Sequence, residues 1–209
     1  MADNTYKNSK EVSDNSLRMD RFQDVVMKPY LEGRGENDVP ADELAARSLI
    51  PPLTAAQRSF ANVASEIPVY APELCISCME CVIQCPDAAV HARVTPQADL
   101  DAALAGLSAD RKAEIMQNIG RTKKFWDLYE KKGNVPGNFS IWIDPDKCKG
   151  CGECAEICKD RGALKMTHKD DALMNRYRAN MVFLRDALPK TKPEYISDQL
   201  LTDLFLNED

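Results

Sequence analysis

The sequence predicts an α+β fold in which one strand–loop–helix–strand unit occurs twice. All eight cysteines fall in two runs of the same spacing, C-x2-C-x2-C-x3-C, and corresponding cysteines such as Cys75 and Cys148 lie 73 positions apart. An apolar, strand-like segment precedes each run and another follows it. A repeat of this kind predicts two halves related by a pseudo-two-fold axis.

The cysteine spacing is typical of a bacterial-type ferredoxin fold that holds two [4Fe–4S] clusters. Gaps of two residues allow three thiolates from one tight loop to reach three iron corners, and the loop offers backbone N–H groups to the cluster sulfurs. In two-cluster ferredoxins the fourth cysteine of each run ligates the other cluster. Transferred by position, cluster 1 takes Cys75, Cys78, Cys81 and Cys158, and cluster 2 takes Cys148, Cys151, Cys154 and Cys85.

Other uses of the cysteines are disfavoured by their pattern. Zinc sites usually pair C-x2-C units across a longer loop, and neither quartet contains such a loop. Disulfides would need an oxidising compartment, which nothing in the sequence indicates. A purely structural role of the clusters is a further alternative. His91 and His168 have similar places in the two halves, but all cluster corners are already filled, so we expect neither to be a ligand.

Residues 1–66 are predicted to be an N-terminal extension. A polar tail to residue 16 precedes an amphipathic helix over residues 17–31, which Pro29 is expected to end, and a loop over residues 32–40 follows. Asp42 is placed to cap a helix through Ser48. The capping box Thr54-Ala-Ala-Gln57 predicts another helix from Ala55 to about Ser65.

Residues 67–170 are predicted to form the two-cluster ferredoxin domain. Its expected strands cover residues 67–72, 88–95, 139–144 and 163–167, and its expected short helices cover residues 79–84 and 152–157. The halves are separated by a helical insertion over about residues 96–138, with helices expected at 98–105, 108–119 and 121–132. The last of these mixes aromatic and basic residues, so it is either a docking face or a helix that packs back on the domain.

Residues 171–209 are predicted to be a C-terminal helical docking tail. The pattern Leu173, Tyr177, Met181 and Leu184 indicates a helix over residues 171–188, and apolar residues from Ile196 to Phe205 indicate a final amphipathic helix. Apolar stripes outside a small cluster-centred core favour a partner groove. Packing against the ferredoxin domain itself is the equal alternative.

The composition excludes several classes of function. The net charge is −6, which disfavours nucleic acid because that ligand requires a basic face. No run reaches the roughly 18 apolar residues of a membrane span, and the N-terminus lacks the apolar core of a signal peptide. These features and reduced thiols predict a cytoplasmic protein. No phosphate-binding loop, dinucleotide fingerprint or thiamine diphosphate motif is present.

The segments that flank the cysteines carry a more specific signal. They are Leu53-Thr-Ala-Ala, Ile67-Pro-Val-Tyr-Ala-Pro-Glu-Leu before Cys75, Cys85-Pro-Asp-Ala-Ala-Val90, and Phe139-Ser-Ile-Trp-Ile-Asp144 before the second run. Over about residues 50–170, these segments and the long insertion resemble the ferredoxin domain of pyruvate:ferredoxin oxidoreductase and related 2-oxoacid:acceptor oxidoreductases. The chain departs from that pattern at Lys159, where the usual proline is missing, and its turn Lys159-Asp-Arg-Gly162 is longer than the first.

The resemblance implies an electron-transfer subunit without carbon chemistry of its own. Thiamine diphosphate is then expected only in a larger catalytic subunit, which decarboxylates the 2-oxoacid. Electrons would leave through the two clusters to an external acceptor such as a ferredoxin, a flavodoxin or a flavoprotein. The alternatives are a ferredoxin-like subunit of another redox complex, of the complex I or hydrogenase type, and a free ferredoxin.

Overall fold

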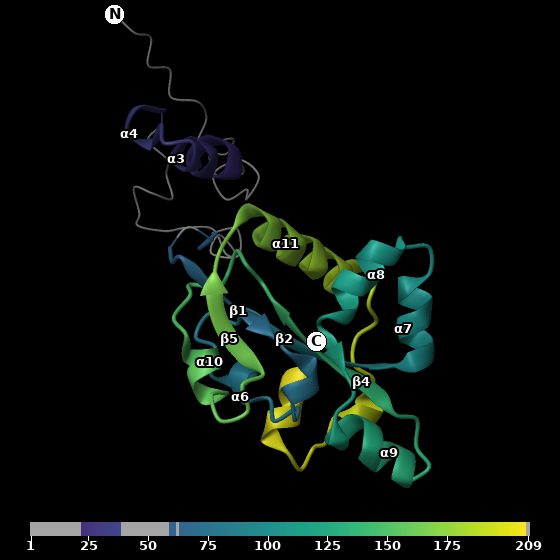
Figure 1. Cartoon of the computed structure of the whole chain (residues 1–209). Helices are drawn as coiled ribbons and strands as arrows, with labels where there is room; N and C mark the ends of the chain where they lie inside the picture. The colour runs from purple at the N-terminus through teal and green to yellow at the C-terminus, as the bar shows by residue number, and fades with distance from the viewer. Residues whose placement is uncertain (1–21, 39–58, 62, 208–209) are drawn as a thin grey trace, which may run out of the picture. The chain divides into compact units, whose positions relative to one another are not determined.

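The computed structural model describes residues 22–38, 59–61 and 63–207 (Figure 1). The chain divides into two compact units, Met1–Arg58 and Ser59–Asp209. The cysteines and both predicted halves lie in the second unit. No helix among the described residues is long and apolar enough to cross a membrane.

The described part of the first unit is helical. A π-helical turn, η1 (Gln23–Met27), continues directly into α3 (Lys28–Leu31). Pro29 lies inside α3 and does not stop it at once, and the helix ends at Leu31, the last residue of the predicted range. The expected loop over residues 32–40 contains a further helical turn, α4 (Gly35–Asp38).

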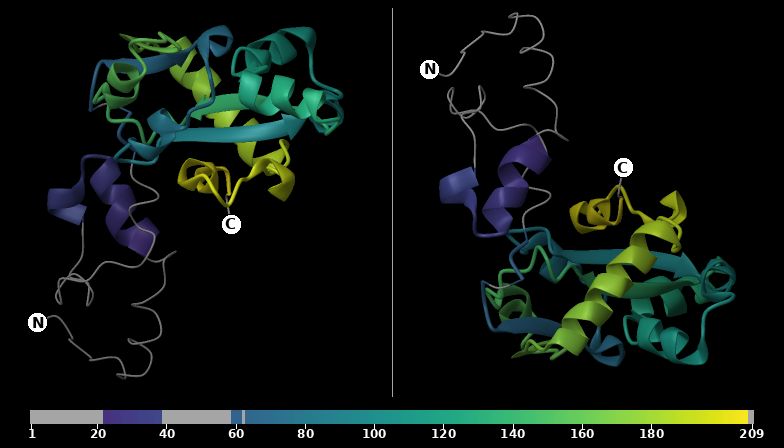
Figure 2. Two further views of the ribbon diagram at one scale, coloured as in Figure 1. Left: turned by 90° about the horizontal axis from the view of Figure 1, so that it is seen from below. Right: turned by 90° about the horizontal axis from the view of Figure 1, so that it is seen from above.

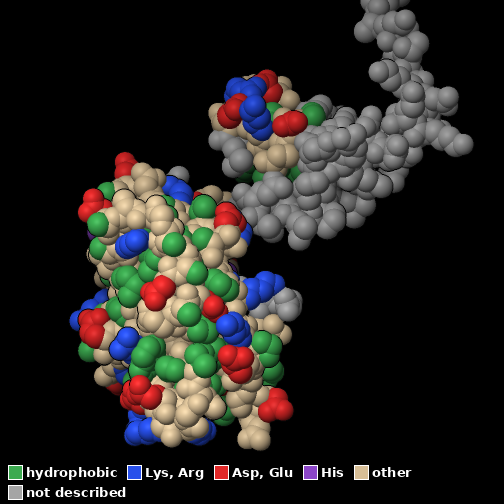
Figure 3. Space-filling view, turned by 90° about the vertical axis from the view of Figure 1, so that its right-hand side faces the viewer, with side chains coloured by type: hydrophobic (Ala, Val, Ile, Leu, Met, Phe, Trp, Pro, Cys, Tyr) green, Lys and Arg blue, Asp and Glu red, His purple; other side chains and the backbone are tan. Residues whose placement is uncertain are grey.

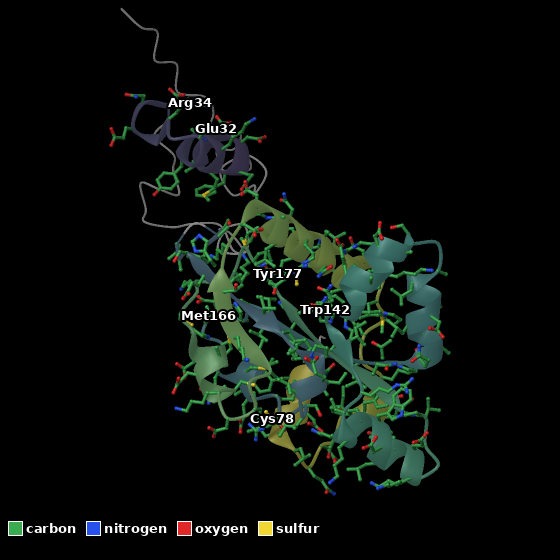
Figure 4. The ribbon with its side chains drawn as sticks, in the orientation of Figure 1. Glu32, Arg34, Cys78, Trp142, Met166 and Tyr177 are labelled. Carbon is green, nitrogen blue, oxygen red and sulfur yellow. The ribbon has the colours of Figure 1, made fainter. Side chains whose placement is uncertain are left out.

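The exposed side chain of Arg34 stabilises this helical turn. Its guanidinium group pairs with the carboxylates of Glu32 and Asp38, and the hydrogen bond from Arg34 lowers the pKa of Glu32 (Figure 4). The helix expected from Asp42 to Ser48 lies outside the described residues, as does the capping box at Thr54.

The described residues of the second unit form five antiparallel-paired strands in two small sheets. β1 (Glu66–Tyr70) pairs with β5 (Leu164–His168), and β2 (Val90–Pro96) and β3 (Ile119–Gly120) flank β4 (Gly137–Ile143). The first strand of one half therefore pairs with the last strand of the other half, in both sheets. Each strand expected from the sequence is present within two residues of its predicted bounds, and β3 is an addition that the sequence analysis missed.

Short helices follow the cysteine loops and longer ones fill the insertion and the tail. Their bounds are η3 (Pro72–Leu74), α6 (Glu80–Ile83), α7 (Gln97–Leu104), α8 (Ala109–Met116), η4 (Lys123–Asp127), α9 (Leu128–Lys131), α10 (Glu153–Ile157), α11 (Asp171–Asp186), η5 (Pro193–Tyr195) and η6 (Leu201–Leu206). Ser108 caps α8 and Asp170 caps α11, each by accepting a backbone N–H of the first turn.

Every residue of β4 is buried, because the strand has a covering layer on each face. Phe139, Ile141 and Ile143 belong to the main hydrophobic core, which also contains the cysteine loops. Trp142 faces the other way and joins α7, α8 and α11 in a second core. In Figure 2 the C-terminal segment and helices α7 and α8 lie on opposite sides of β2 and β4.

The tail is an integral part of this unit. Leu173, Tyr177 and Leu184 of α11 are all less than a tenth exposed, and the Tyr177 hydroxyl donates to the Pro68 carbonyl at 2.9 Å. Arg93, a buried residue of β2, donates to the Leu184 carbonyl at 2.5 Å near the C-terminal end of α11. The apolar stripe of α11 is therefore buried within the chain, and the alternative of packing against the ferredoxin domain describes it.

Two further expectations differ from the structure. The final amphipathic segment is not one α-helix but the two 3-10 turns η5 and η6, whose residue Leu206 is fully buried. The described residues between Ser59 and Ser65 are not helical. There the Phe60 N–H and the Ser59 hydroxyl donate to Asp146, at 2.6 and 2.8 Å, so the segment is tied to the second cysteine half.

The insertion packs back on the unit through its aromatic residues. Phe125 is buried and stacks on Phe139 with ring centroids 5.7 Å apart, while Tyr129 lies 5.1 Å from the ring of Tyr195. Its outward face, with α7, α8 and α9, mixes hydrophobic side chains with acidic and basic ones (Figure 3). Together with the tail, the insertion forms one compact unit from Ser59 onward, rather than separate parts divided at residues 66 and 171.

Candidate metal-cluster sites

The two cysteine loops share an unusual backbone. Ser77 and Met79 in the first loop have positive φ angles of 58° and 67°, and Gly150 and Gly152 in the second have 68° and 81°. These positions correspond, since both pairs lie two and four residues after the first cysteine of their run. Left-handed residues in a short loop turn successive N–H groups toward one side, which creates a concavity suited to an anion. The loops can thus donate to a negatively charged cluster.

The first loop reaches this shape at a conformational cost. Glycine adopts positive φ freely, whereas serine and methionine in this region carry strain of about 1–3 kcal/mol each. The surroundings hold both residues, because Ser77 and Met79 are about 1% exposed and the Ser77 hydroxyl lies 3.1 Å from that of Thr122. The Ser77 N–H donates a hydrogen bond to the Cys75 sulfur, with 3.4 Å between nitrogen and sulfur.

Two cavities of similar size are each lined by four cysteines, and in each cavity the four come from both cysteine runs. Cavity 1 encloses about 390 Å³ of atom-free space, including the solvent at its mouth, and its cysteines are Cys75, Cys78, Cys81 and Cys158. Cavity 2 encloses about 350 Å³ in the same sense, and its cysteines are Cys85, Cys148, Cys151 and Cys154. Each cavity takes three cysteines from one run and the fourth from the other run, and all eight thiols are free.

The helices that follow the loops bring the two runs together. α6 and α10 are in contact, and Cys85 and Cys158 lie just beyond their C-terminal ends. The Ala89 N–H donates to the Cys85 sulfur at 3.2 Å. Figure 4 labels one lining residue of each cavity, Cys78 and Met166, and shows them on separate parts of the unit.

Burial governs the chemistry of the thiols. It raises the pKa of Cys154 to about 12 and that of Cys81 still higher, with further contributions from the neighbouring cysteines. Burial also raises the pKa of Cys75, against the opposing effect of the nearby Tyr70 hydroxyl and the Ser77 N–H. Without a bound cation these thiols stay protonated at neutral pH. Metal binding must therefore displace protons, which makes cluster loading depend on pH.

The lining of both cavities is mostly apolar with charges at the edge. Arg161 lies 3.6 Å from Glu80 beside cavity 1, and Lys149 lies 2.6 Å from Asp87 beside cavity 2. Among the described residues, no three His, Cys, Asp or Glu side chains are arranged to hold a single metal ion. The cysteines surround a space instead of converging on a point, and such a thiol-lined space fits an iron–sulfur cubane.

Sequence reasoning found the cysteines but not the rest of the lining. His91 is partly exposed and His168 is exposed, and neither lines a cavity. Tyr70, at the end of β1, and Met166, on β5, were not singled out as site residues. The available signal for Tyr70 was its place five residues before Cys75, at the end of a strand that leads into the loop.

Comparison with known proteins agrees with this chemistry. Two family models, both described as a 4Fe-4S binding domain, match residues 72–91 and 141–160. The chain therefore carries two 4Fe–4S binding motifs, which between them contain all eight cysteines.

Similarity to longer proteins extends beyond the motifs. A putative pyruvate-flavodoxin oxidoreductase of Synechocystis sp. is 30% identical over 125 residues, which are 60% of this chain and 9% of that protein. A pyruvate-flavodoxin oxidoreductase of Rhodospirillum rubrum is 25% identical over 190 residues, 86% of this chain and 14% of that protein. The pyruvate:ferredoxin oxidoreductase of Moorella thermoacetica is 31% identical over 141 residues, 66% and 10% respectively.

The chain spans about a tenth of the length of these curated relatives. The resemblance stated from the flanking segments is confirmed: the chain is related to the iron–sulfur part of these oxidoreductases and carries motifs of electron transport.

Proposed function

We propose that this chain is an electron-transfer subunit that holds two [4Fe–4S] clusters with crossed ligation. Cys75, Cys78, Cys81 and Cys158 would hold cluster 1, and Cys148, Cys151, Cys154 and Cys85 would hold cluster 2. The observation that carries the proposal is the pair of similar cavities, each lined by one of these mixed sets of four cysteines. When bound, each cluster would take up and release one electron at a time.

The pairing of strands supports the pseudo-two-fold arrangement in this proposal. Exchanging the halves converts the β1–β5 pair into the β4–β2 pair. In β1–β5 the residue five positions before the first cysteine, Tyr70, lies opposite Leu164, the first residue of β5. In β2–β4 the corresponding residue, Ile143, lies opposite Val90, the first residue of β2. The two pairs correspond even though the turn after the fourth cysteine is one residue longer in the second half. Leu164 lies six residues after Cys158, whereas Val90 lies five residues after Cys85.

The chain's own residues would position, insulate and separate the two clusters. The loop N–H groups face the negative charge, and the apolar lining excludes water. Cys154 of the second site is near enough to Cys81 of the first to contribute to the raised pKa of the Cys81 thiol. Two clusters at such neighbouring sites are placed for direct electron exchange.

We further propose that the electrons come from a thiamine-diphosphate-dependent catalytic subunit that oxidises a 2-oxoacid. The support is the activity in the names of the relatives, which are pyruvate oxidoreductases about ten times as long as the matched segment. This chain would pass the electrons to a ferredoxin, a flavodoxin or a flavoprotein, in the cytoplasm where thiols stay reduced. The exposed apolar residues of η6, which include Leu201 and Phe205, are our candidates for docking to the catalytic subunit.

Anaerobic chemical analysis and a reduction assay test the two parts separately. We expect eight iron and eight acid-labile sulfide per chain, from two four-iron clusters. We expect Cys81→Ala and Cys154→Ala each to lose chiefly one cluster. A chain that carries zinc or four iron in the unaltered form contradicts the cluster proposal. Normal loading with reduction by dithionite, but not by the co-purified catalytic subunit and 2-oxoacid, contradicts the donor while leaving the electron-transfer role intact.

A further inference from the structure

One buried tyrosine hydroxyl in the second unit lies at cavity 1 beside a cysteine sulfur. Tyr70 is 8% exposed, ends β1 and lines cavity 1 beside the cysteines. Its hydroxyl oxygen is buried and makes no hydrogen bond of normal geometry in the described part of the chain. The neighbouring group is the Cys75 sulfur, and hydrogen bonding from the Tyr70 hydroxyl to that sulfur lowers the pKa of the thiol against the larger effect of burial. The hydroxyl is thus at the cavity with its donor directed to a cysteine sulfur.

The other tyrosines with buried or half-buried hydroxyls are satisfied by backbone carbonyls. Tyr177 donates to Pro68 at 2.9 Å, Tyr195 to Val135 at 3.0 Å, and Tyr129 to Glu194 at 2.8 Å. Buried polar groups in native proteins are rarely left unpaired. No carbonyl accepts from Tyr70, and its hydroxyl is directed to the Cys75 sulfur at cavity 1, so its acceptor belongs to the cysteines or to the group that they hold.

The second site differs at the corresponding position. Ile143 occupies the place of Tyr70, five residues before its first cysteine and opposite the first residue of the paired strand. Ile143 offers no donor, and the described residues that line cavity 2 include no side-chain hydroxyl. The two sites therefore have matching cysteines but unequal donors.

We propose that the Tyr70 hydroxyl donates a hydrogen bond to a sulfur of cluster 1, on Cys75 or on an inorganic sulfide, and raises the reduction potential of that cluster alone. The inference rests on the proposed two-cluster function. A reduced cluster carries one more negative charge than the oxidised one, so an O–H donor stabilises the reduced form more. Hydrogen bonds to the sulfurs are among the features that set iron–sulfur potentials.

The test is an anaerobic redox titration of the full chain followed by EPR. Tyr70→Phe removes the donor and keeps the ring, so we expect a lower midpoint potential for one cluster and an unchanged potential for the other. A tenfold change in the reduction equilibrium would appear as a shift of about 59 mV, since one electron is transferred. Tyr195→Phe is the matched control, because it removes a buried tyrosine hydroxyl that faces a carbonyl away from the cysteines. It should shift neither midpoint.

A second replacement gives a change of opposite sign. Site-specific incorporation of 3-fluorotyrosine at position 70 makes the hydroxyl a stronger donor, so the same midpoint should rise. Iron and sulfide are measured on every sample, which separates loss of a cluster from a change in its potential. The proposal is overturned if fully loaded Tyr70→Phe keeps both midpoints, or if both clusters shift equally. It is also overturned if the shifted cluster is the one that Cys154→Ala removes.

Discussion

Replacing Leu206 by alanine should destabilise the cysteine-bearing unit, although Leu206 lies three residues from the end of the chain. Leu206 is the last residue of η6, is fully buried and belongs to the main core. η6 contacts α6, the helix of the first cysteine run, and is also held by an ion pair between Asp203 and Lys124. The tail thus covers part of the core beside the first cysteine run.

The expected magnitude follows from this burial. A leucine-to-alanine change in a packed core costs about 2–5 kcal/mol, depending on how far the site collapses. Taking about 3 kcal/mol and a unit of this size, the Tm should fall by about 6–12 °C. Leu201 begins the same 3-10 segment but is 75% exposed, so Leu201→Ala should stay within about 0.5 kcal/mol of the unaltered chain.

The assay compares the two variants on anaerobic, cluster-loaded protein. Urea unfolding followed by far-UV circular dichroism gives the midpoint, and loss of visible absorbance reports the clusters in the same samples. We expect Leu206→Ala alone to move both transitions to lower urea. Equal midpoints for Leu206→Ala and Leu201→Ala would refute the reasoning, because they would mean that the tail is detached from the core in solution. Weaker binding of a catalytic subunit by Leu201→Ala alone would support docking through the exposed side of η6.

Three further outcomes are expected. Truncation after Lys169 should lose both clusters, because α11 and the 3-10 turns complete the core; a truncated chain with eight iron, measured chemically, would show otherwise. Cys85→Ser should damage cluster 2 and spare cluster 1 in EPR of the reduced protein, since Cys85 lines cavity 2, and the reverse pattern would contradict crossed ligation. Lys159→Pro should lower the potential of cluster 1 by less than Tyr70→Phe does, because Lys159 is exposed and paired with Glu156; a larger shift in the titration would be contrary evidence.

The local pattern of the sequence was sufficient for most elements. The strands around the cysteines, α7, α8 and α11 all occur where alternation, capping residues and helical periodicity indicated them. Gly150 and Gly152 are natural choices for the left-handed positions of the second loop. The same backbone at Ser77 and Met79 had no such signal, because tertiary contacts rather than residue type hold the first loop in that shape.

Long-range contacts were decided by packing. The pairing of β3 with β4 rests on two residues, too few to leave a periodic pattern. Pro29 was expected to end the first helix, yet the helix continues from η1 through Pro29 to Leu31. The aromatic residues of the insertion could serve a partner or the core with the same sequence, and Phe125 is buried against Phe139.

The sequence by itself determined the cluster chemistry, because ligand type and spacing within one run are local properties of the chain. The stripe of α11 was equally visible, but an apolar stripe indicates that a face is buried without indicating what buries it. Only the tertiary structure decided that β4 and Arg93 cover this helix. It also decided that the Tyr70 hydroxyl lies at cavity 1, whereas Ile143, at the corresponding position of the second half, has no hydrogen-bond donor in its side chain. Those outcomes depend on which surfaces pack together in the folded chain, and that is decided by segments that are far apart in the sequence.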